Sequence, residues 1–331
     1  MTRVAVLGAG SWGTTLANLL ATKGEDVRLW AYEPEVVEAV NRSAENPIFL
    51  PGVRLSAHVR ALSDLQEAVT DAEVIVSAPP SHAVRGVISR LGGAAAPGTL
   101  VVSATKGIET DTLALMSEVF AECLPQVRFS ALSGPSFAAE VCEGQPTAVV
   151  AAARDEATAR AAQQVFATPV FRVYRNRDVR GVELAGALKN VIAVAAGIAE
   201  GLGLGHNPRA ALITRGLAEI TRLGLAMGAD PLTFAGLAGM GDLVLTTTGS
   251  LSRNRSLGIA LAGGQTFEEY RATHRSVAEG ANTSLAGAAL GKRFGIELPI
   301  IEQVCEVLFR GRAPREAITQ LMGRELKSEQ W

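Results

Sequence analysis

A glycine-rich turn near the start of the chain constrains the fold more than any other feature. The apolar run Val4–Leu7 is followed at once by a Gly-x-Gly-x-x-Gly motif at residues 8–13, and a helical pattern of apolar residues comes next. A continuous apolar run is typical of a strand buried on both faces of a parallel sheet. In such a unit Gly8 and Gly10 allow a tight turn close to a pyrophosphate, and Gly13 lets the helix pack on the strand. The helix N-terminus then offers N–H groups to the anion. We therefore predict a dinucleotide-binding turn.

An acidic residue after the second strand supports this prediction. The run Val27–Ala31 is followed by Tyr32 and Glu33, and Glu33 lies 20 residues after Gly13. The dinucleotide fingerprint has a carboxylate at about this distance, where it binds the ribose hydroxyls. The alternative is a βαβ unit without a ligand, which would have no use for this spacing.

Composition limits the class of protein. A chain of 331 residues is long enough for two domains, and its net charge of −2 gives no general attraction to nucleic acid or to a membrane surface. We find no uninterrupted apolar run of the roughly 18 residues that a membrane span needs, and the chain enters its first strand without room for a signal peptide. The three cysteines are far apart and the four histidines lack ligand-like spacing, so we expect neither disulfides nor a metal site. These features predict a soluble cytoplasmic protein.

The first half of the chain alternates strand and helix patterns, which is the sign of a doubly wound parallel sheet. The further strands that we predict are Val74–Ser77, Leu100–Ala104, Phe129–Leu132, Ala148–Ala152 and Phe171–Tyr174. Small or polar loops follow three of them, at residues 78–82, 105–107 and 133–136. Ligands of such sheets bind at the carboxyl ends of the strands, so these loops should line the cleft.

The pattern changes at Asp178, which can cap a helix that runs to about Ala199. The strand pattern does not return after this point. The later helices that we predict are near Pro208–Met227, Leu257–Ala262, Asn282–Phe294, Pro299–Phe309 and Pro314–Leu321. We therefore predict an α/β fold with a Rossmann-type parallel sheet in residues 1–179 and an all-helical substrate and catalytic domain in residues 180–331.

A lysine in the first of these helices is a candidate catalytic group. Lys189 shares its helix face with small apolar residues, among them Gly186 and Ala193, and with Ile192. It could extend along the helix to water, or it could point into a cavity, where burial would lower its pKa and suit it to proton transfer. The pattern alone favours neither interpretation.

Two further segments carry candidate groups with weaker signals. Gly239–Leu243 contains Asp242, which could orient a lysine or a hydroxyl, and Ser250–Arg255 is rich in donors that could bind a phosphate. The plain alternative for Ser250–Arg255 is a solvated loop in which Ser252 or Asn254 caps the next helix, and the pattern alone favours it.

Residues at the ends of two central strands belong to the same group of candidates. Lys106 follows one strand, and Gly134 and Ser136 follow the next, at the edge where the cofactor should lie. Surface lysines are common after strands, so the position of Lys106 alone does not distinguish a ligand contact from a surface residue. A glycine at position 134 allows close approach of the backbone to a ligand.

Seven segments together resemble bacterial-type NAD(P)-dependent sn-glycerol-3-phosphate dehydrogenase. They are Gly8–Gly13, Ala104–Gly107, Leu132–Ser136, Gly186–Asn190, Ala238–Leu243, Ser252–Asn254 and Val277–Gly280. The resemblance runs in order from about residue 3 to residue 323. It implies an enzyme that interconverts dihydroxyacetone phosphate and sn-glycerol 3-phosphate for phospholipid synthesis, usually as a homodimer, with NAD or NADP as cofactor and without a metal.

The resemblance also implies roles for single residues. Lys189 would donate and accept the proton. The substrate would be bound by Lys106, Gly134, Ser136, Asp242, Ser252, Arg253 and Asn254. The cofactor would be contacted, beside the glycines and Glu33, by Ser11, Trp12, Tyr32, Lys106, Ala138, Arg253, Val277 and Glu279.

The sequence departs from the family pattern at Tyr32, where the family often has a basic residue. A basic group would attract the 2′-phosphate of NADP, whereas a carboxylate alone favours NAD. Two other functions are compatible with a dinucleotide fold: a two-domain reductase of hydroxy or keto acids, and a nucleotide sensor without catalysis. The first would not need the Ser252–Asn254 loop, and the second would not need Lys106, Lys189, Asp242 and Arg253.

Overall fold

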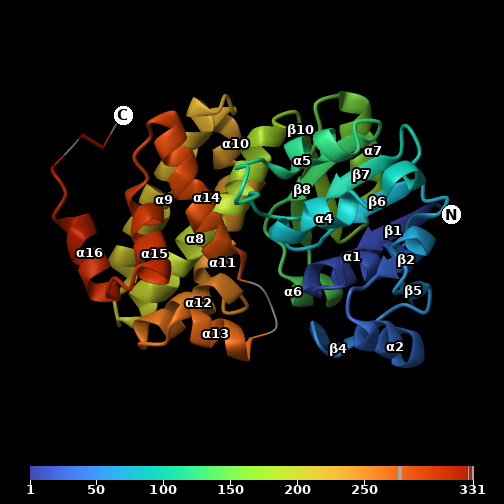
Figure 1. Cartoon of the computed structure of the whole chain (residues 1–331), viewed down its shortest axis with the longest axis horizontal. Helices are drawn as coiled ribbons and strands as arrows, with labels where there is room; N and C mark the ends of the chain where they lie inside the picture. The colour runs from blue at the N-terminus through green and yellow to red at the C-terminus, as the bar shows by residue number, and fades with distance from the viewer. Residues whose placement is uncertain (275–277, 327, 330–331) are drawn as a thin grey trace.

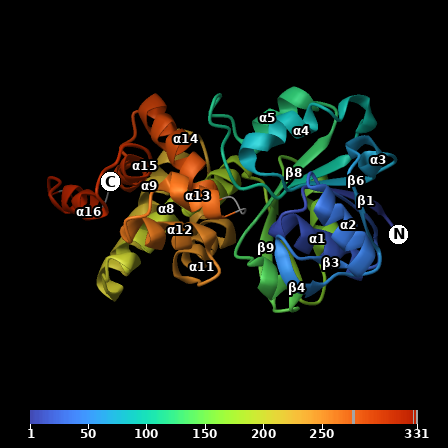
Figure 2. The same cartoon turned by 60° about the horizontal axis from the view of Figure 1, so that its bottom comes forward.

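The computed structural model of the chain describes residues 1–274, 278–326 and 328–329. Two lobes lie side by side in it (Figure 1), an α/β lobe that carries the N-terminus and a helical lobe that carries the C-terminus. The view in Figure 2 shows the same separation from a second direction.

The α/β lobe is built on an eight-stranded sheet. In order across the sheet, its strands are β10 (Phe171–Asn176), β9 (Thr147–Ala152), β8 (Arg128–Ser133), β7 (Leu100–Ser103), β6 (Val74–Ser77), β1 (Arg3–Leu7), β2 (Asp26–Trp30) and β5 (Val59–Leu62). All of the predicted strands are present, and their ends differ from the prediction by two residues or fewer. The sequence patterns missed β5 and a small hairpin of β3 (Glu45–Asn46) and β4 (Leu50–Arg54).

The sheet is mostly parallel, as predicted, but one pair of strands near its edge is antiparallel. β8 and β9 pair antiparallel, whereas β9 and β10 are parallel to each other, so these two strands run against the other six. The connection between β8 and β9 contains only the five-residue helix α6 (Ala138–Cys142). The eleven-residue helix α7 (Glu156–Phe166) supplies the crossover between β9 and β10.

Both faces of the sheet are buried, which explains the continuous apolar runs. Alternate residues of β1 belong to two different cores: Val4 and Val6 pack on one face with Leu16, and Ala5 and Leu7 pack on the other. The remaining helices of this lobe are α1 (Ser11–Thr22), α2 (Pro34–Ser43), α3 (Leu65–Val69), α4 (Val84–Ile88) and α5 (Met116–Cys123), with single turns at η1 (Ser81–Ala83) and η2 (Gly92–Ala94).

The helical lobe begins with α8 (Val179–Gly201). Its other helices are α9 (His206–Ala226), α10 (Pro231–Ala235), the π-helical turn η3 (Leu237–Gly241), α11 (Asp242–Thr248), α12 (Arg253–Ala262), α13 (Phe267–Thr273), α14 (Glu279–Phe294), α15 (Pro299–Phe309) and α16 (Pro314–Met322). Asp178 caps α8 as predicted, because its carboxylate accepts a hydrogen bond from the Gly181 N–H at 2.9 Å.

Helix α8 is the core of this lobe. By length and composition it could cross a membrane. However, 89% of the 18-residue window that gives it this apolar character is buried inside the protein. Its backbone touches that of α12, since a Cβ on Gly197 would lie 2.0 Å from the Arg255 carbonyl oxygen and one on Gly258 would lie 2.1 Å from the Val194 carbonyl oxygen. This close crossing holds the start of α12 beside the middle of α8, where Lys189 lies.

Candidate active site

The glycine turn is shaped for an anion. Gly8 has a φ of +100°, and a Cβ there would lie 2.9 Å from the Pro79 nitrogen. A Cβ on Gly13 would lie 1.9 Å from the Gly8 carbonyl oxygen, so only glycine lets α1 pack this closely on β1. By contrast, none of the described atoms lies within 4 Å of a Cβ built on Gly10. The turn therefore keeps open space at the N-terminus of α1, which fits the pyrophosphate of a dinucleotide.

Three predicted cofactor contacts border this turn. Ser11 donates its hydroxyl hydrogen bond to the Phe49 carbonyl, so the segment before β4 covers the start of α1. The indole N–H of Trp12 is buried and has no partner among the described residues. Ala138 is the first residue of α6, and its carbonyl accepts a hydrogen bond from the Thr15 hydroxyl at 3.4 Å.

The end of β2 carries the groups that would face the adenosine ribose. Tyr32 is 79% exposed, and Glu33 follows it at the start of α2. Arg28 is turned away from this end, because its guanidinium donates to the carbonyls of Glu67 and Thr70, both at 2.9 Å. The basic group nearest in sequence is thus engaged elsewhere.

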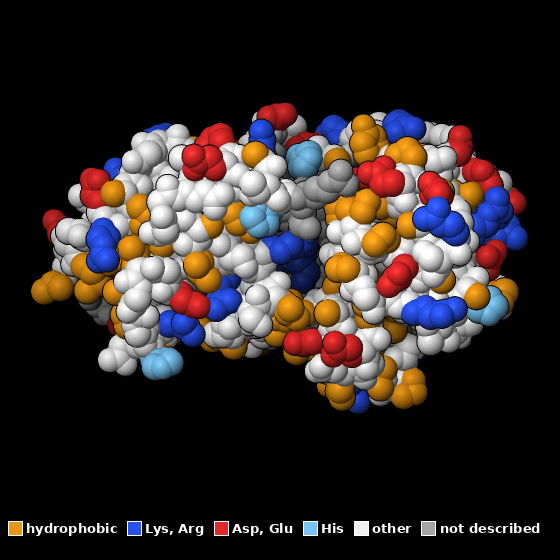
Figure 3. All heavy atoms as spheres, turned by 90° about the horizontal axis from the view of Figure 1, so that it is seen from below, with side chains coloured by type: hydrophobic (Ala, Val, Ile, Leu, Met, Phe, Trp, Pro, Cys, Tyr) orange, Lys and Arg blue, Asp and Glu red, His pale blue; other side chains and the backbone are white. Residues whose placement is uncertain are grey.

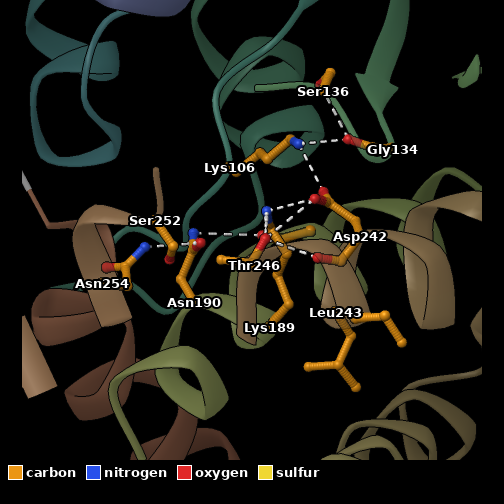
Figure 4. A network of polar contacts seen from close by, with 12 residues as sticks. Lys106, Gly134, Ser136, Lys189, Asn190, Asp242, Leu243, Thr246, Ser252 and Asn254 are labelled. Atoms are coloured by element: carbon orange, nitrogen blue, oxygen red, sulfur yellow. Dashed lines mark hydrogen bonds and ion pairs between the residues drawn. The ribbon is translucent and has the colours of Figure 1, made fainter. Parts of the chain in front are cut away.

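A hollow separates the two lobes, and Lys and Arg side chains gather inside it (Figure 3). Asp242 joins two lysines from different lobes (Figure 4). One carboxylate oxygen accepts from Lys189 and the other from Lys106, each at 2.6 Å. Lys189 also donates to the Thr246 hydroxyl at 2.7 Å, and Lys106 donates to the Gly134 carbonyl at 3.0 Å. The interpretation of Lys189 as a lysine that extends to water is therefore wrong.

The local fold explains why Asp242 points at the lysines. The turn η3 runs directly into α11, and a Cβ on Gly239 would lie 2.1 Å from the Phe234 carbonyl oxygen. The glycine at this position thus allows the tight winding that places Asp242 as the first residue of α11. π-Helical turns occur frequently at functional sites.

Burial and charge set the protonation of this cluster. Burial lowers the pKa of Lys189 to about 8, although the Asp242 carboxylate raises it and Lys106 lowers it further. Burial pushes the pKa of Asp242 upward, but the two ammonium groups outweigh burial and hold the pKa below its ordinary value. Lys189 is therefore a buried acid that can release its proton near neutral pH.

The plain alternative for the Ser252–Asn254 segment is right about the helix cap and wrong about solvation. Ser252 is the N-cap of α12 and accepts from the Arg255 N–H at 3.3 Å, and both Ser252 and Asn254 are buried. Arg255 donates two hydrogen bonds to Glu200, from Nε at 2.8 Å and from Nη2 at 2.5 Å. Arg253 is exposed and makes no hydrogen bond or ion pair with any residue that the structure describes. Of the two arginines in this segment, Arg253 is the one available to a ligand.

The remaining predicted site residues that the structure describes are Gly134, Ser136 and Glu279. Gly134 has a φ of +136°, and its carbonyl accepts from the Ser136 hydroxyl at 3.0 Å. Glu279 is the first residue of α14, and its carboxylate accepts from the N–H and hydroxyl of Ser81 at 3.0 and 2.7 Å. Val277 lies outside the described residues.

Sequence reasoning missed three polar residues of the site. Thr246 lies one turn after Asp242 on α11, and Asn190 accepts a hydrogen bond from the Asn254 side chain at 2.9 Å. Asn46 is fully buried and donates at 2.8 Å to the carbonyl of Ala9 in the glycine turn. The i, i+4 spacing from Asp242 was a signal for Thr246, whereas nothing in the local sequence marks Asn46.

The described residues, which leave out 275–277, 327 and 330–331, contain no group of three or more His, Cys, Asp or Glu side chains placed to hold a metal ion. The site consists of an anion-binding turn on one lobe and a lysine–carboxylate cluster between the lobes.

Two family models match the chain. Residues 3–159 match the N-terminus, and residues 178–319 the C-terminus, of NAD-dependent glycerol-3-phosphate dehydrogenase. The chain belongs to this family. A glycerol-3-phosphate dehydrogenase (NAD(P)+) of Geobacter sulfurreducens is 56% identical over 332 residues, which is 99% of each chain.

Solved structures agree with this membership. The crystal structure of glycerol-3-phosphate dehydrogenase from Coxiella burnetii aligns with a TM-score of 0.94 and 40% identity, over 97% of this chain and 98% of that one. A ketopantoate reductase from Ralstonia eutropha aligns over 96% of this chain and 99% of its own with a TM-score of 0.60 and 20% identity, a likeness that shows the fold alone. The family assignment therefore favours the dehydrogenase over the keto-acid reductase that the sequence also allowed.

Proposed function

We propose that Lys189 is the proton donor and acceptor of an NAD(P)-dependent glycerol-3-phosphate dehydrogenase, which interconverts dihydroxyacetone phosphate and sn-glycerol 3-phosphate. The observation that carries the proposal is the buried ammonium of Lys189. Two of its three N–H groups are bound by Asp242 and Thr246. The third N–H is left to donate to a carbonyl oxygen in the hollow.

Reduction of the ketone needs a hydride on the carbonyl carbon and a proton on the oxygen. The nicotinamide supplies the hydride when it is bound. Lys189 hydrogen-bonds the carbonyl oxygen, stabilises the negative charge that develops there and transfers its proton. In the direction of oxidation, neutral Lys189 takes the proton from the hydroxyl group.

Asp242 fixes the position of both lysines at 2.6 Å. Without its charge, the two ammonium groups would repel each other in a buried site. Lys106 has one N–H beyond its bonds to Asp242 and Gly134, so it can reach a substrate oxygen or the cofactor. We assign it a role in binding and in charge stabilisation, beside the proton transfer by Lys189.

The substrate phosphate would bind at the start of α12. Arg253 offers a planar fork of N–H donors, and one N–H of Asn254 remains after its bond to Asn190. The Ser252 hydroxyl can also donate, because its oxygen accepts from Arg255. Gly134 and Ser136 complete the binding site from the opposite lobe. Binding energy from the phosphate would position the carbonyl carbon for reaction.

The cofactor would lie over the ends of β2, β1 and β6. In this proposal residues 1–179 form the cofactor domain, in which Gly8, Gly10 and Gly13 hold the pyrophosphate and Glu33 the adenosine ribose. Ser11, Trp12, Tyr32 and Ala138 border it, and Arg253 and Glu279 reach it from the catalytic domain of residues 180–331. Val277 is included on the family resemblance alone.

We also propose that the enzyme is a cytoplasmic homodimer that supplies glycerol 3-phosphate for phospholipid synthesis and has no nucleic-acid or membrane partner. The family resemblance supports the dimer, the composition of the chain supports its location, and the net charge of −2 supports the absence of a nucleic-acid partner. Light scattering coupled to size exclusion would test the dimer.

The activity is tested by the loss of reduced-nicotinamide absorbance. We expect oxidation of NADH or NADPH that depends on dihydroxyacetone phosphate. Dihydroxyacetone and pyruvate should not replace it, because they lack the phosphate that Arg253 would bind. Equal rates with dihydroxyacetone phosphate and with dihydroxyacetone would contradict the proposed function, and so would the absence of turnover.

A further inference from the structure

A serine of the cofactor domain is bound to a glutamate of the catalytic domain across the hollow. The N–H of Ser81 donates to one carboxylate oxygen of Glu279 at 3.0 Å, and its hydroxyl donates to the other at 2.7 Å. Ser81 is 2% exposed and starts the turn η1 after β6, and Glu279 starts α14. Two donors from one residue therefore fix both oxygens of a carboxylate 198 positions away.

This contact lies at the catalytic end of the cofactor cleft. A Cβ on Gly107 would lie 2.4 Å from the Cβ of Ser81 and 3.2 Å from a carboxylate oxygen of Glu279. Gly107 follows Lys106, which binds the same carboxylate as Lys189. The adenosine end at Glu33 lies at β2, on the other side of β1 from β6. The contact therefore faces the nicotinamide half of a dinucleotide.

Glu279 is also connected to the catalytic helix. The N–H of Gly280 donates to the Asn254 side chain at 2.9 Å, and Asn254 donates to Asn190, beside Lys189, at 2.9 Å. A Cβ on Gly280 would lie 2.5 Å from the Asn190 carbonyl oxygen, so α14 packs directly on α8 here. Fixing Glu279 thus fixes the start of α14 relative to both the cofactor loop and the catalytic helix.

We propose that Ser81 is a positioning residue of the dehydrogenase reaction: it holds the Glu279 carboxylate, and with it the start of α14, in place against the nicotinamide half of the cofactor. The inference rests on the proposed function, because it assigns Glu279 to the cofactor. Ser81 acts through Glu279. Burial raises the pKa of Glu279, and the two donors of Ser81 oppose that rise, so Ser81 also favours the ionised carboxylate.

The chain offers a matched control. The N–H of Ser117 donates to Glu183 at 2.8 Å and its hydroxyl donates to the other oxygen at 2.5 Å, in the same two-donor arrangement between the two domains. Glu183 is 7% exposed on α8, and Ser117 lies on α5. Ser117→Ala removes an equivalent hydrogen bond, which is made to α8 and not to the start of α14.

The experiment measures the Kd of NADH and of ADP-ribose, which lacks the nicotinamide, for the full chain by fluorescence titration. We expect Ser81→Ala to raise the Kd of NADH about tenfold, as expected for a lost hydrogen bond to a charged group, and to leave the Kd of ADP-ribose nearly unchanged. The KM of NADH should rise with it, while the KM of dihydroxyacetone phosphate changes little. Ser117→Ala should leave both Kd values unchanged.

Three results would overturn the proposal: an unchanged NADH Kd in Ser81→Ala, a parallel loss for NADH and ADP-ribose, or an equal loss in Ser117→Ala. If Ser81→Ala does not fold, Ser81→Cys keeps the side-chain volume with a weak S–H donor and should show the same selective loss. Failure of the proposed function is distinguishable, since a wild-type protein that binds NADH but does not reduce dihydroxyacetone phosphate still gives both Kd values.

Discussion

The two halves of the active site are built from different kinds of group. In the cofactor domain the decisive features are backbone ones, a turn of three glycines and the N-terminus of α1, and they lie within six consecutive residues. In the catalytic domain the decisive features are side chains, and Asp242 meets Lys189 from 53 positions away and Lys106 from 136. The cofactor half leaves open space for a ligand because its glycines have no side chains. The catalytic half brings buried charged side chains together, and these side chains can react with a substrate.

Mutations in the two halves of the active site should therefore have different effects. A change in the cofactor half should alter either folding or nucleotide affinity, depending on which glycine is replaced. A change at Lys189 or Asp242, which lie in the catalytic half and are not assigned to the cofactor, should alter turnover or substrate affinity and leave nucleotide binding intact.

The largest effect is expected from Lys189→Met. Methionine keeps the length and apolar stem of the side chain, so the helix should fold while the proton donor is lost. Loss of general acid catalysis alone should lower kcat by about 10²–10⁴-fold. The Kd of NADH should not change, because the glycine turn lies in the other domain. A folded variant with kcat within about tenfold of wild type would move the proton donor elsewhere, with Lys106 as the next candidate.

The next effect is expected from Arg253→Ala. Loss of a charged, bidentate phosphate partner should cost roughly 2–4 kcal/mol in kcat/KM for dihydroxyacetone phosphate. Arg253→Lys should also be impaired, because lysine cannot reproduce the fork. Arg255, which is bound to Glu200, is the comparison: Arg255→Lys should lower Tm rather than raise the KM of the substrate. The opposite pattern in these two arginines would assign the phosphate to Arg255.

Two glycines of the same motif should separate folding from binding. Gly13→Ala places a methyl group 1.9 Å from the Gly8 carbonyl oxygen and should destabilise the fold by about 3 kcal/mol, measured by denaturant unfolding. Gly10→Ala adds a methyl group where no described atom is near, so stability should hold while the Kd of NADH rises on the order of tenfold. Similar losses of stability in both variants would contradict the assignment of the open space to the pyrophosphate.

The smallest effect concerns the choice of cofactor. Glu33 without a basic neighbour should repel a 2′-phosphate, and Arg28 is held by two carbonyls of the α3 region. We therefore expect usable activity with NADH and at most a modest preference for NADPH. Tyr32→Arg should shift the ratio of kcat/KM values toward NADPH. Strict dependence of the wild-type enzyme on NADPH would show that another group binds the phosphate.

The contrast between local and long-range features also explains which parts of the structure the sequence predicts. The glycine turn, the strands and the cap at Asp178 follow from local patterns, so their positions were predictable to within a few residues. The reversal at β9 depends on how the chain crosses the edge of the sheet, and alternation of apolar residues does not encode strand direction. The contacts of Lys189 with Asp242 and of Asn46 with Ala9 join distant segments, and no local pattern specifies them. Only the resemblance to a family placed Lys106, Lys189 and Asp242 in one site before the fold did.

The role of Lys189 as the proton donor is tested most directly by the pH dependence of kcat/KM in both directions, for wild type and Asp242→Asn. Lys189 must be protonated to reduce the ketone and neutral to oxidise the alcohol. Because burial lowers its pKa to about 8, reduction should fall as the pH rises through about 8, and oxidation should fall as the pH drops below it. Asp242 raises this pKa, so Asp242→Asn should move both transitions to lower pH. Transitions that stay at the same pH in the variant, or a reduction rate that increases above pH 8, would contradict Lys189 as the acid.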